Sequence, residues 1–308
     1  MELRHLRYFI SVAEEGSFLA AAERRLHTAQ PSLSRQIRDL ESEVGVKLLE
    51  RRARGVVLTA AGKVFLDHAR LALSQVEAAA EGARRAEQPE KPVFVIGFLP
   101  GQEVVWLPHA LRIIREEAPG IEIILSSQAS PQLALALMRG KMDVAILRHE
   151  TQTVGLSFRF LTKEPLIAIL PADHRLASRK KIRPQDLARA KIISVRRGLA
   201  PVVQSLIDDY AATVGITLKA AYDADTLSGA MSLVASTGGV TLFPLSVQNM
   251  LTPNLVARAL EGKAPSIDLM LGYNKTNSSP LLKQFLSRAD ELVEGVRKQS
   301  ILGYAEAR

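Results

Sequence analysis

The chain has 308 residues, a length that predicts two or three domains rather than one core. With 47% hydrophobic and 23% charged residues, its composition indicates globular domains rather than a disordered segment. The net charge of +8 is spread over residues 1–92 (15 Lys and Arg against 13 Asp and Glu) and 93–308 (25 against 19), so charge alone locates no nucleic-acid site. The absence of Cys excludes disulfides and thiolate chemistry. With neither a membrane span of roughly 18 to 20 apolar residues nor a secretion signal, we expect a cytoplasmic protein. No metal or other cofactor is expected, because the sequence has no metal-ligand spacing and no nucleotide-binding motif.

Residues 1–59 predict three short helices followed by a wing. Apolar residues recur at spacings of three and four, and glycines and capping residues interrupt them. They indicate one helix ended by Gly16, a second capped by Ser17 over 18–26, and a third capped by Thr28 and ended by Gly45. Two short strands follow, over 46–49 and 56–58, on either side of a basic turn. This order of elements is typical of a winged helix-turn-helix.

Residues 60–87 predict one long helix that pairs with a second copy of the chain. From Thr59 to about Glu87, small and apolar residues alternate steps of three and four, which is the spacing of a coiled-coil seam. At 1.5 Å per residue this helix would reach roughly 40 Å, too long to pack on one small domain. Pro89 and Pro92 end it, because prolines favour extended backbone, so we expect residues 88–92 to form a hinge.

Beyond Pro92, predicted strands and helices alternate, which indicates an α/β fold with parallel strands. The expected strands are 93–98, 121–126, 143–147, 166–170, 192–195, 218–221, 240–243, 256–260 and 267–272. The expected helices are 107–118, 130–139, 200–214, 225–236 and 280–297. We expect an effector-binding domain over 93–300, made of lobe I (about 93–163 and 268–300) and lobe II (about 164–267), with a cleft between the lobes.

The segment from Thr28 to Ile37 carries the side chains that a DNA reader needs. If Leu33 and Ile37 face the core, the polar residues occupy the other faces of the same helix. In the major groove, Gln pairs with adenine, Arg with guanine, and Ser with a base or a phosphate. Polar residues on a helix are usually just solvated, so the hypothesis depends on the assembly of turn, helix and basic wing.

The motifs LRYF at 6–9, GSF at 16–18, QPSLSRQI at 30–37 and LTAAG at 58–62 are dense and specific. Through them, residues 1–60 resemble the DNA-binding domain of the LysR-type transcriptional regulators, and weaker similarity continues to about residue 297. The resemblance implies a winged helix-turn-helix, a dimerising linker helix and a sensor domain shaped like periplasmic binding proteins, usually assembled as a tetramer. It implies contacts to DNA bases from Gln30, Pro31, Ser34 and Arg35. It also implies contacts to the DNA backbone from Ser17, Ser32, Arg38, Arg51, Arg52 and Thr59. Ala29 departs from the Ser or Thr of many members, so no cap or phosphate contact is expected from it.

Ligands of open α/β lobes bind at the carboxyl ends of strands. This rule and the resemblance select Pro100, Gly101, Ser127, Ala129, Ser130, Arg148, Val195, Arg196, Thr226, Phe243 and Pro244. Ser130 suits either a helix cap or a ligand contact. Arg148 and Arg196 either hold a carboxylate, which favours an organic or aromatic acid as effector, or are solvated charges. We expect Trp106 to pack in the core, and the basic run 179–183 to be a solvated loop.

Together these patterns predict a sequence-specific DNA-binding transcription regulator, controlled by a small-molecule effector. The expected partners are double-stranded DNA at an inverted-repeat promoter site, further copies of the chain as a dimer of dimers, and RNA polymerase. An enzyme is disfavoured because the six His lack metal-ligand spacing and no P-loop, GxGxxG or GxSxG occurs. A solute-binding protein would not need residues 1–87. A constitutive DNA-binding protein stays open, and a cleft filled by side chains would favour it.

Overall fold

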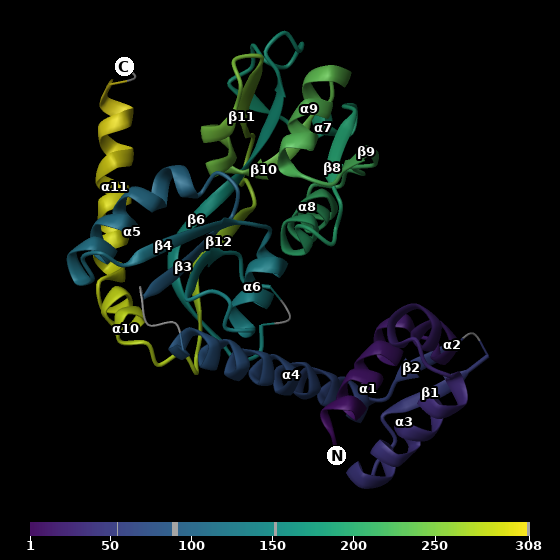
Figure 1. Ribbon diagram of the computed structural model, residues 1–308. Coiled ribbons are helices and arrows are strands. Elements are labelled where there is room, and N and C mark those ends of the chain that lie inside the picture. The colour runs from purple at the N-terminus through teal and green to yellow at the C-terminus, as the bar shows by residue number, and fades with distance from the viewer. Residues whose placement is uncertain (54, 88–91, 151–152, 307–308) are drawn as a thin grey trace. The chain divides into compact units, whose positions relative to one another are not determined.

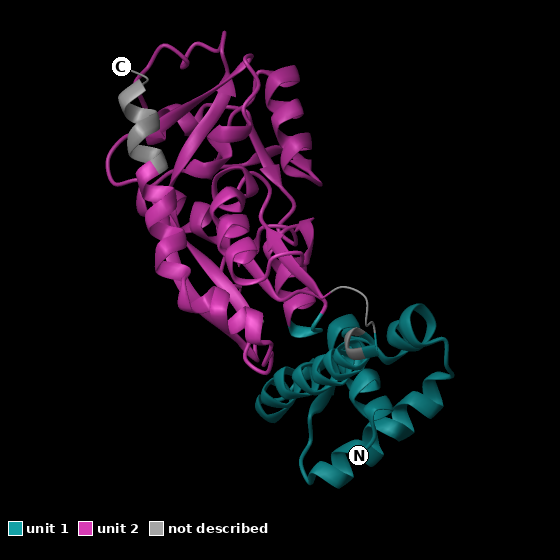
Figure 2. Ribbon diagram, turned by 60° about the vertical axis from the view of Figure 1, so that its left-hand side comes forward, with its two compact units in different colours: residues 1–87, 138–140 teal, residues 88–137, 141–308 magenta. Residues whose placement is uncertain are grey.

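The computed structural model describes residues 1–53, 55–87, 92–150 and 153–306. The distribution of contacts divides the chain into two compact units, residues 1–87 with 138–140 and residues 88–137 with 141–308 (Figure 2). None of the helices in the described ranges combines the length and the apolar character needed to cross a membrane. The predicted hinge over 88–92 lies outside the described residues except for Pro92.

The first unit is a helical bundle with a two-stranded hairpin (Figure 1). Its elements are α1 (Leu3–Glu15), α2 (Phe18–Ala20), the π-helical turn η1 (Ala21–Leu26), α3 (Gln30–Val44), β1 (Leu49–Arg52), β2 (Gly55–Leu58) and α4 (Ala60–Glu87). Phe9, Leu33 and Ile37 are buried in one cluster, as the helical spacing predicts. The rings of Phe9 and Phe65 meet edge to face at 5.1 Å between centroids, which joins α1 to α4.

Two local predictions in this unit were wrong. The residue that caps α3 is Ala29, not Thr28; its backbone is extended and its side chain makes no capping bond. The first strand begins at Leu49 and not at residue 46, because the carboxylate of Glu41 accepts the backbone N–H groups of Leu48 and Leu49. The backbone N–H groups of Leu48 and Leu49 are therefore bonded to a side chain of α3, whereas residues 46–49 were expected to pair with the second strand.

The second unit is built on one curved sheet with the order β4-β3-β5-β12-β6-β11-β7, to which β10 adds beside β6, and on a smaller pair, β8-β9. Its strands are β3 (Val93–Phe98), β4 (Glu122–Ser127), β5 (Val144–Leu147), β6 (Leu156–Pro171), β7 (Lys181–Ile182), β8 (Ile192–Val195), β9 (Ala220–Ala224), β10 (Thr241–Pro244), β11 (Leu255–Leu260) and β12 (Ser266–Asn274). Its helices are α5 (Glu103–Glu117), α6 (Ser130–Met138), α7 (Pro184–Ala188), α8 (Pro201–Thr213), α9 (Leu227–Thr237), η2 (Leu245–Met250), α10 (Pro280–Ser287) and α11 (Ala289–Glu306). The parallel pairs β3-β4, β3-β5 and β8-β9 confirm the predicted α/β class.

Strand β6 runs through both lobes of this unit. The sequence predicts only residues 166–170 as a strand. In the structure the strand begins at Leu156, and its first half mixes buried, half-buried and exposed side chains without regular alternation. In the structure β12 pairs antiparallel with residues 156–165, and β10 and β11 pair with residues 166–171. The first half of β6 therefore belongs to lobe I and the second half to lobe II.

Three further predictions need correction. Helix α5 begins at Glu103, four residues earlier than expected, and contains Pro108. The closing helix predicted over 280–297 is two helices, because Arg288 leaves helical geometry between α10 and α11. The run 179–183 is not wholly a solvated loop, since Ile182 is buried in β7 beside β11.

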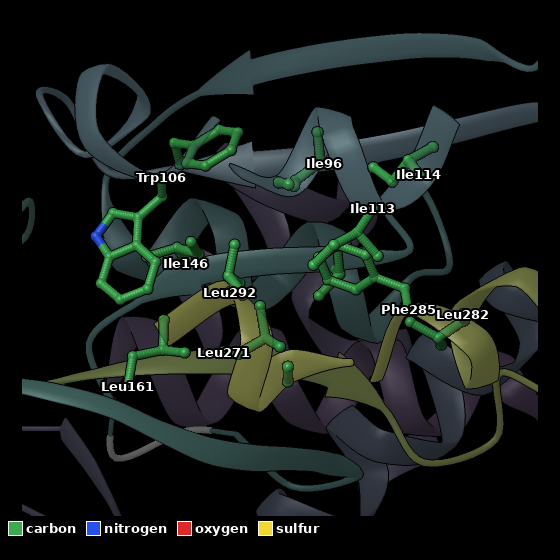
Figure 3. Packing of buried hydrophobic residues seen from close by; sticks show 14 of the residues in the cluster. Ile96, Trp106, Ile113, Ile114, Ile146, Leu161, Leu271, Leu282, Phe285 and Leu292 are labelled. Atoms are coloured by element: carbon green, nitrogen blue, oxygen red, sulfur yellow. The ribbon is translucent and has the colours of Figure 1, made fainter. Parts of the chain in front are cut away.

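The core of lobe I lies where β3, β5 and β12 meet α5, α10 and α11. Figure 3 shows Ile96, Ile146 and Leu271 among the side chains of these helices. Trp106 is 2% exposed and packs here, as predicted. Its indole nitrogen turns away from the other labelled side chains (Figure 3) and donates to the side-chain oxygen of Gln102 at 2.9 Å. The sole Trp of the chain is thereby linked to Gln102, a residue that lines a cavity between the lobes.

Candidate functional site

The first candidate site is the exposed face of α3 in the helix-turn-helix. Leu33 and Ile37 point into the core, while the side chains of the first turns remain exposed: Gln30, Pro31, Ser32, Arg35 and Arg38. Free backbone N–H groups at a helix start favour a phosphate, and exposed Gln and Arg side chains can read base edges. The geometry thus leaves this face available to a DNA groove.

Ser34 and Arg51 bind each other across the unit. The Ser34 side chain is only 8% exposed and its hydroxyl accepts a hydrogen bond from Nη2 of Arg51 at 2.5 Å. The guanidinium carbon of Arg51 also lies 4.9 Å from the centre of the Phe18 ring, within range of a cation–π contact. Arg51 therefore connects α2, α3 and β1.

Of the other residues predicted to contact the DNA backbone, Ser17 and Thr59 cap helices and Arg52 is an exposed arginine. The hydroxyl of Ser17 accepts from the N–H of Ala20, and that of Thr59 accepts from the N–H of Gly62 at 2.8 Å, so both residues cap helices. Arg52 is exposed and pairs only loosely, at 3.5 Å, with Glu50. Capping and DNA contact are compatible, and the DNA contacts of all ten residues stay predictions.

Glu41 is a buried charged residue of this unit to which the sequence analysis assigned no role. It is 7% exposed; one oxygen accepts from the Leu48 and Leu49 amides at 2.9 and 3.0 Å, and the other accepts from Lys47 at 2.8 Å. Burial alone would raise the pKa of Glu41, but these bonds lower that pKa below its ordinary value. Glu41 is therefore a buried anion that fastens α3 to the start of the wing.

The second candidate site is a cavity of about 420 Å³ in the second unit, mostly walled by apolar groups. Both lobes line it, since its wall includes loops after β3, β4 and β5 and loops after β8, β9 and β10. The predicted residues that line it are Pro100, Ser127, Ala129, Ser130, Arg148, Val195, Thr226, Phe243 and Pro244. A cavity of this size and character suits a single small organic molecule. The cleft is open space, so the side-chain-filled cleft of a constitutive DNA-binding protein is not observed.

Arg148 is the buried cation of the cavity. It is 4% exposed and its Nη2 donates to the carboxylate of Glu164 on β6. The other terminal nitrogen, Nη1, is fully buried and has no hydrogen-bond partner in the described part of the chain. A buried guanidinium with a free donor is costly unless a ligand satisfies it. Arg148 is therefore not a solvated charge.

Gln102 connects Glu164, the partner of Arg148, to Ser246 in lobe II. Its side-chain nitrogen lies 3.2 and 3.3 Å from the oxygens of Glu164 and donates to the hydroxyl of Ser246 at 2.7 Å. Ser246 follows β10 in lobe II, whereas Gln102 precedes α5 in lobe I. A buried polar chain thus runs between the lobes along the cavity wall.

The other predicted ligand residues have intramolecular roles or lie outside the lining. The hydroxyl of Ser130 accepts from the backbone N–H of Arg148 at 2.9 Å, which joins the start of α6 to the end of β5. Thr226 caps α9 through the N–H of Gly229. Arg196 is exposed and pairs with Asp225 at 2.7 Å, and Gly101 lies against the sulfur of Met250. Neither Arg196 nor Gly101 lines the cavity.

Several lining residues escaped the sequence analysis. Gln102, Glu150 and Ser246 contribute polar groups to the wall, and the apolar additions include Leu199, Val203, Leu227 and Val247. Glu150 could have been found, because side chains two residues apart in extended backbone point to the same side and Arg148 was already selected. The described residues contain no group of three or more His, Asp or Glu that could hold a metal ion.

A helix-turn-helix with a wing, followed by a two-lobed α/β domain around a cavity, defines a ligand-controlled transcription regulator. Family models agree with both parts: "Bacterial regulatory helix-turn-helix protein, lysR family" matches residues 3–63, and "LysR substrate binding domain" matches residues 87–293. The chain belongs to the LysR family. It is a DNA-binding transcription regulator whose second domain binds a small-molecule effector, and it is not an enzyme.

Curated relatives match along nearly the whole chain. The Hca operon transcriptional activator HcaR of Escherichia coli is 39% identical over 300 residues, covering 96% of this chain and 99% of the relative. The regulator AlsR of Bacillus subtilis is 35% identical over 286 residues, covering 93% of this chain and 94% of the relative. Among solved structures, CbnR in a complex with its target DNA has 25% identity and a TM-score of 0.55, covering 95% of this chain and 100% of that one.

Proposed function

We propose that the exposed face of α3 reads the major groove of an inverted-repeat promoter site. The residues that contact bases are Gln30, Pro31, Ser34 and Arg35. The residues that contact the DNA backbone are Ser17, Ser32, Arg38, Arg51, Arg52 and Thr59. The exposed Gln30 and Arg35 side chains on the first turns of a packed helix support this assignment. Ser34 reaches a base only if its bond to Arg51 rearranges, so Ser34 has the weakest support of the four.

The protein acts in the cytoplasm as a dimer of dimers, and RNA polymerase is a partner at the promoter. Residues 1–59 form the DNA-binding domain, 60–87 the dimerising linker helix, 88–92 the hinge and 93–300 the effector-binding domain. Paired DNA-binding domains require half-sites about one helical turn apart or a multiple of it.

The effector is an organic acid whose carboxylate is held by Nη1 of Arg148. The single observation that carries this proposal is the free donor: Nη1 is buried in the cavity wall, while Nη2 is occupied by Glu164. A carboxylate is the ligand group that a guanidinium binds most strongly, and the apolar walls accommodate a hydrocarbon or ring.

Binding of benzoate, phenylacetate, 3-phenylpropanoate and 4-phenylbutanoate to the full chain tests the effector site by calorimetry and thermal shift. Arg148→Lys keeps a cation for Glu164, but its single ammonium nitrogen cannot occupy the positions of both Nη1 and Nη2, so we expect at least tenfold weaker binding of any acid that binds. Arg196→Met is the matched control, because Arg196 is exposed and outside the lining. If both variants bound like the wild type, or if no acid stabilised the protein, the assignment would be wrong.

A further inference from the structure

Glu150 is a second buried ionisable group in the cavity, and the effector site proposed above does not use it. It is 6% exposed and lines the same wall as Arg148. Its carboxyl group has no hydrogen bond or ion pair with another residue that the structure describes. A carboxylate taken out of water without a partner is costly, so this group is available to a ligand or to a proton.

The charges around Glu150 are already paired. Arg148, two residues away, is bonded to Glu164 on β6. At the cavity mouth, Asp225 before α9 is bonded to Arg196 after β8. His149 faces away from the cavity, where its ring meets Phe158 edge to face at 4.6 Å. The lining contributed by the loops before α5, α6, α8 and η2 brings no charged side chain. Glu150 therefore adds one uncompensated negative charge.

We propose that the effector is an apolar monocarboxylate and that Glu150 admits it only in the protonated form, so that each effector molecule bound takes up one proton from solvent. This inference rests on the effector function proposed above. An effector carboxylate and an ionised Glu150 would share one desolvated cavity with a single guanidinium that Glu164 already neutralises. Protonation removes the repulsion and supplies an O–H donor. A dicarboxylate would bring a second charge for which the lining has no cation.

The ionisation of Glu150 falls in a range that makes this coupling measurable. Burial raises the pKa of Glu150 to about 7. The free protein at neutral pH therefore holds Glu150 in both forms, and a ligand that binds only the protonated form shifts the group fully to it. The proton is taken up in the binding step, with no bond broken in the effector.

The sign of the pH dependence follows from the same linkage. Well below pH 7, Glu150 is protonated already and the affinity is constant. Above pH 7, the competent fraction falls tenfold per pH unit, so the apparent Kd rises about thirtyfold between pH 6 and pH 8.5 if the ionised form is excluded. The phenyl-substituted acids stay ionised throughout this range, so their own titration adds nothing.

Calorimetry on the full chain at pH 6 and pH 8.5, with the four phenyl-substituted acids, tests the inference. We expect wild-type protein to show this rise in Kd and to take up a proton at pH 8.5, measured from the dependence of the heat on the buffer's ionisation enthalpy. Glu150→Gln cannot ionise and keeps a donor, so its Kd stays constant with pH. His149→Gln is the matched control and keeps the wild-type dependence, because His149 is adjacent to Glu150 in the chain but lies outside the cavity lining.

The outcomes separate this inference from the effector function itself. Binding that depends on Arg148 but shows the same pH dependence in wild type and Glu150→Gln overturns the role of Glu150 and leaves the effector site intact. Tighter binding of 1,4-phenylenediacetate than of its monocarboxylate counterpart, 4-methylphenylacetate, overturns the monocarboxylate class. If none of these acids binds either protein at either pH, both the inference and the effector proposal fail.

Discussion

Replacing Glu41 by Ala tests whether a buried carboxylate fixes the wing on the reading helix. The substitution removes the acceptor of the Leu48 and Leu49 amides, whose residues are 1% and 8% exposed. Each buried N–H left without a partner costs about 1 to 3 kcal/mol, so we expect a loss of about 3 kcal/mol in the local free energy of opening. Hydrogen exchange of these two amides in the full chain should then be accelerated by about 100-fold.

Two variants and a pH series give this prediction its controls. Glu41→Gln keeps one oxygen acceptor and should lose less, whereas Glu50→Ala removes an exposed carboxylate paired at 3.5 Å and should change exchange little. Since the bonds to Glu41 hold its pKa low, protection is full above about pH 4.3 and is lost as the pH falls through the lowered pKa. Equal acceleration by Glu41→Ala and Glu50→Ala would refute the reasoning.

Three other substitutions have defined outcomes. Arg35→Ala should cost roughly 1 to 3 kcal/mol of operator binding and relax specificity at one base pair, measured by competition with operator variants; an equal loss on all sequences would mean a phosphate contact only. Arg52→Ala should weaken binding to every duplex alike and flatten its salt dependence; an unchanged slope would exclude a phosphate contact. Gly62→Ala should destabilise the protein by about 1 to 3 kcal/mol or more, because the new Cβ would lie 1.9 Å from the carbonyl oxygen of Leu48; an unchanged unfolding midpoint would contradict this packing.

The elements that the sequence predicts well are those whose own side chains determine them. Leu33 and Ile37 repeat with the helical period and are buried as expected, and β3 and β8 begin and end at the predicted residues. The first half of β6 was missed because its residues are partly exposed and its strand form depends on β12, about 110 residues later. Pairing between distant segments leaves no periodic signal in either of them.

Some residues of the cavity region could likewise be predicted from the sequence, and others could not. The rule that ligands meet the carboxyl ends of strands selects Pro100, Ser130 and Arg148, all of which line it. It does not select Glu164, which lies within β6, nor Ser246, which opens toward the cavity from a 3-10 turn. The partner of Arg148 could not be predicted, because the choice between solvent, Glu150 and Glu164 is made by the pairing of β6 with β12.

The buried chain through Gln102 shows how a ligand can bias the two lobes. Gln102 in lobe I donates to Ser246 in lobe II, and both line the cavity together with Arg148. A ligand shifts the equilibrium between lobe arrangements only by the difference in its affinity for them, with each 1.4 kcal/mol worth about tenfold. If the effector acid binds Arg148 as proposed, we expect it also to contact Val195 and Phe243 of lobe II, which line the same cavity. Those contacts require the lobe arrangement in which Gln102 is bonded to Ser246. We therefore expect the contacts that select the effector also to stabilise one lobe arrangement, and a ligand confined to lobe I to bind without regulating.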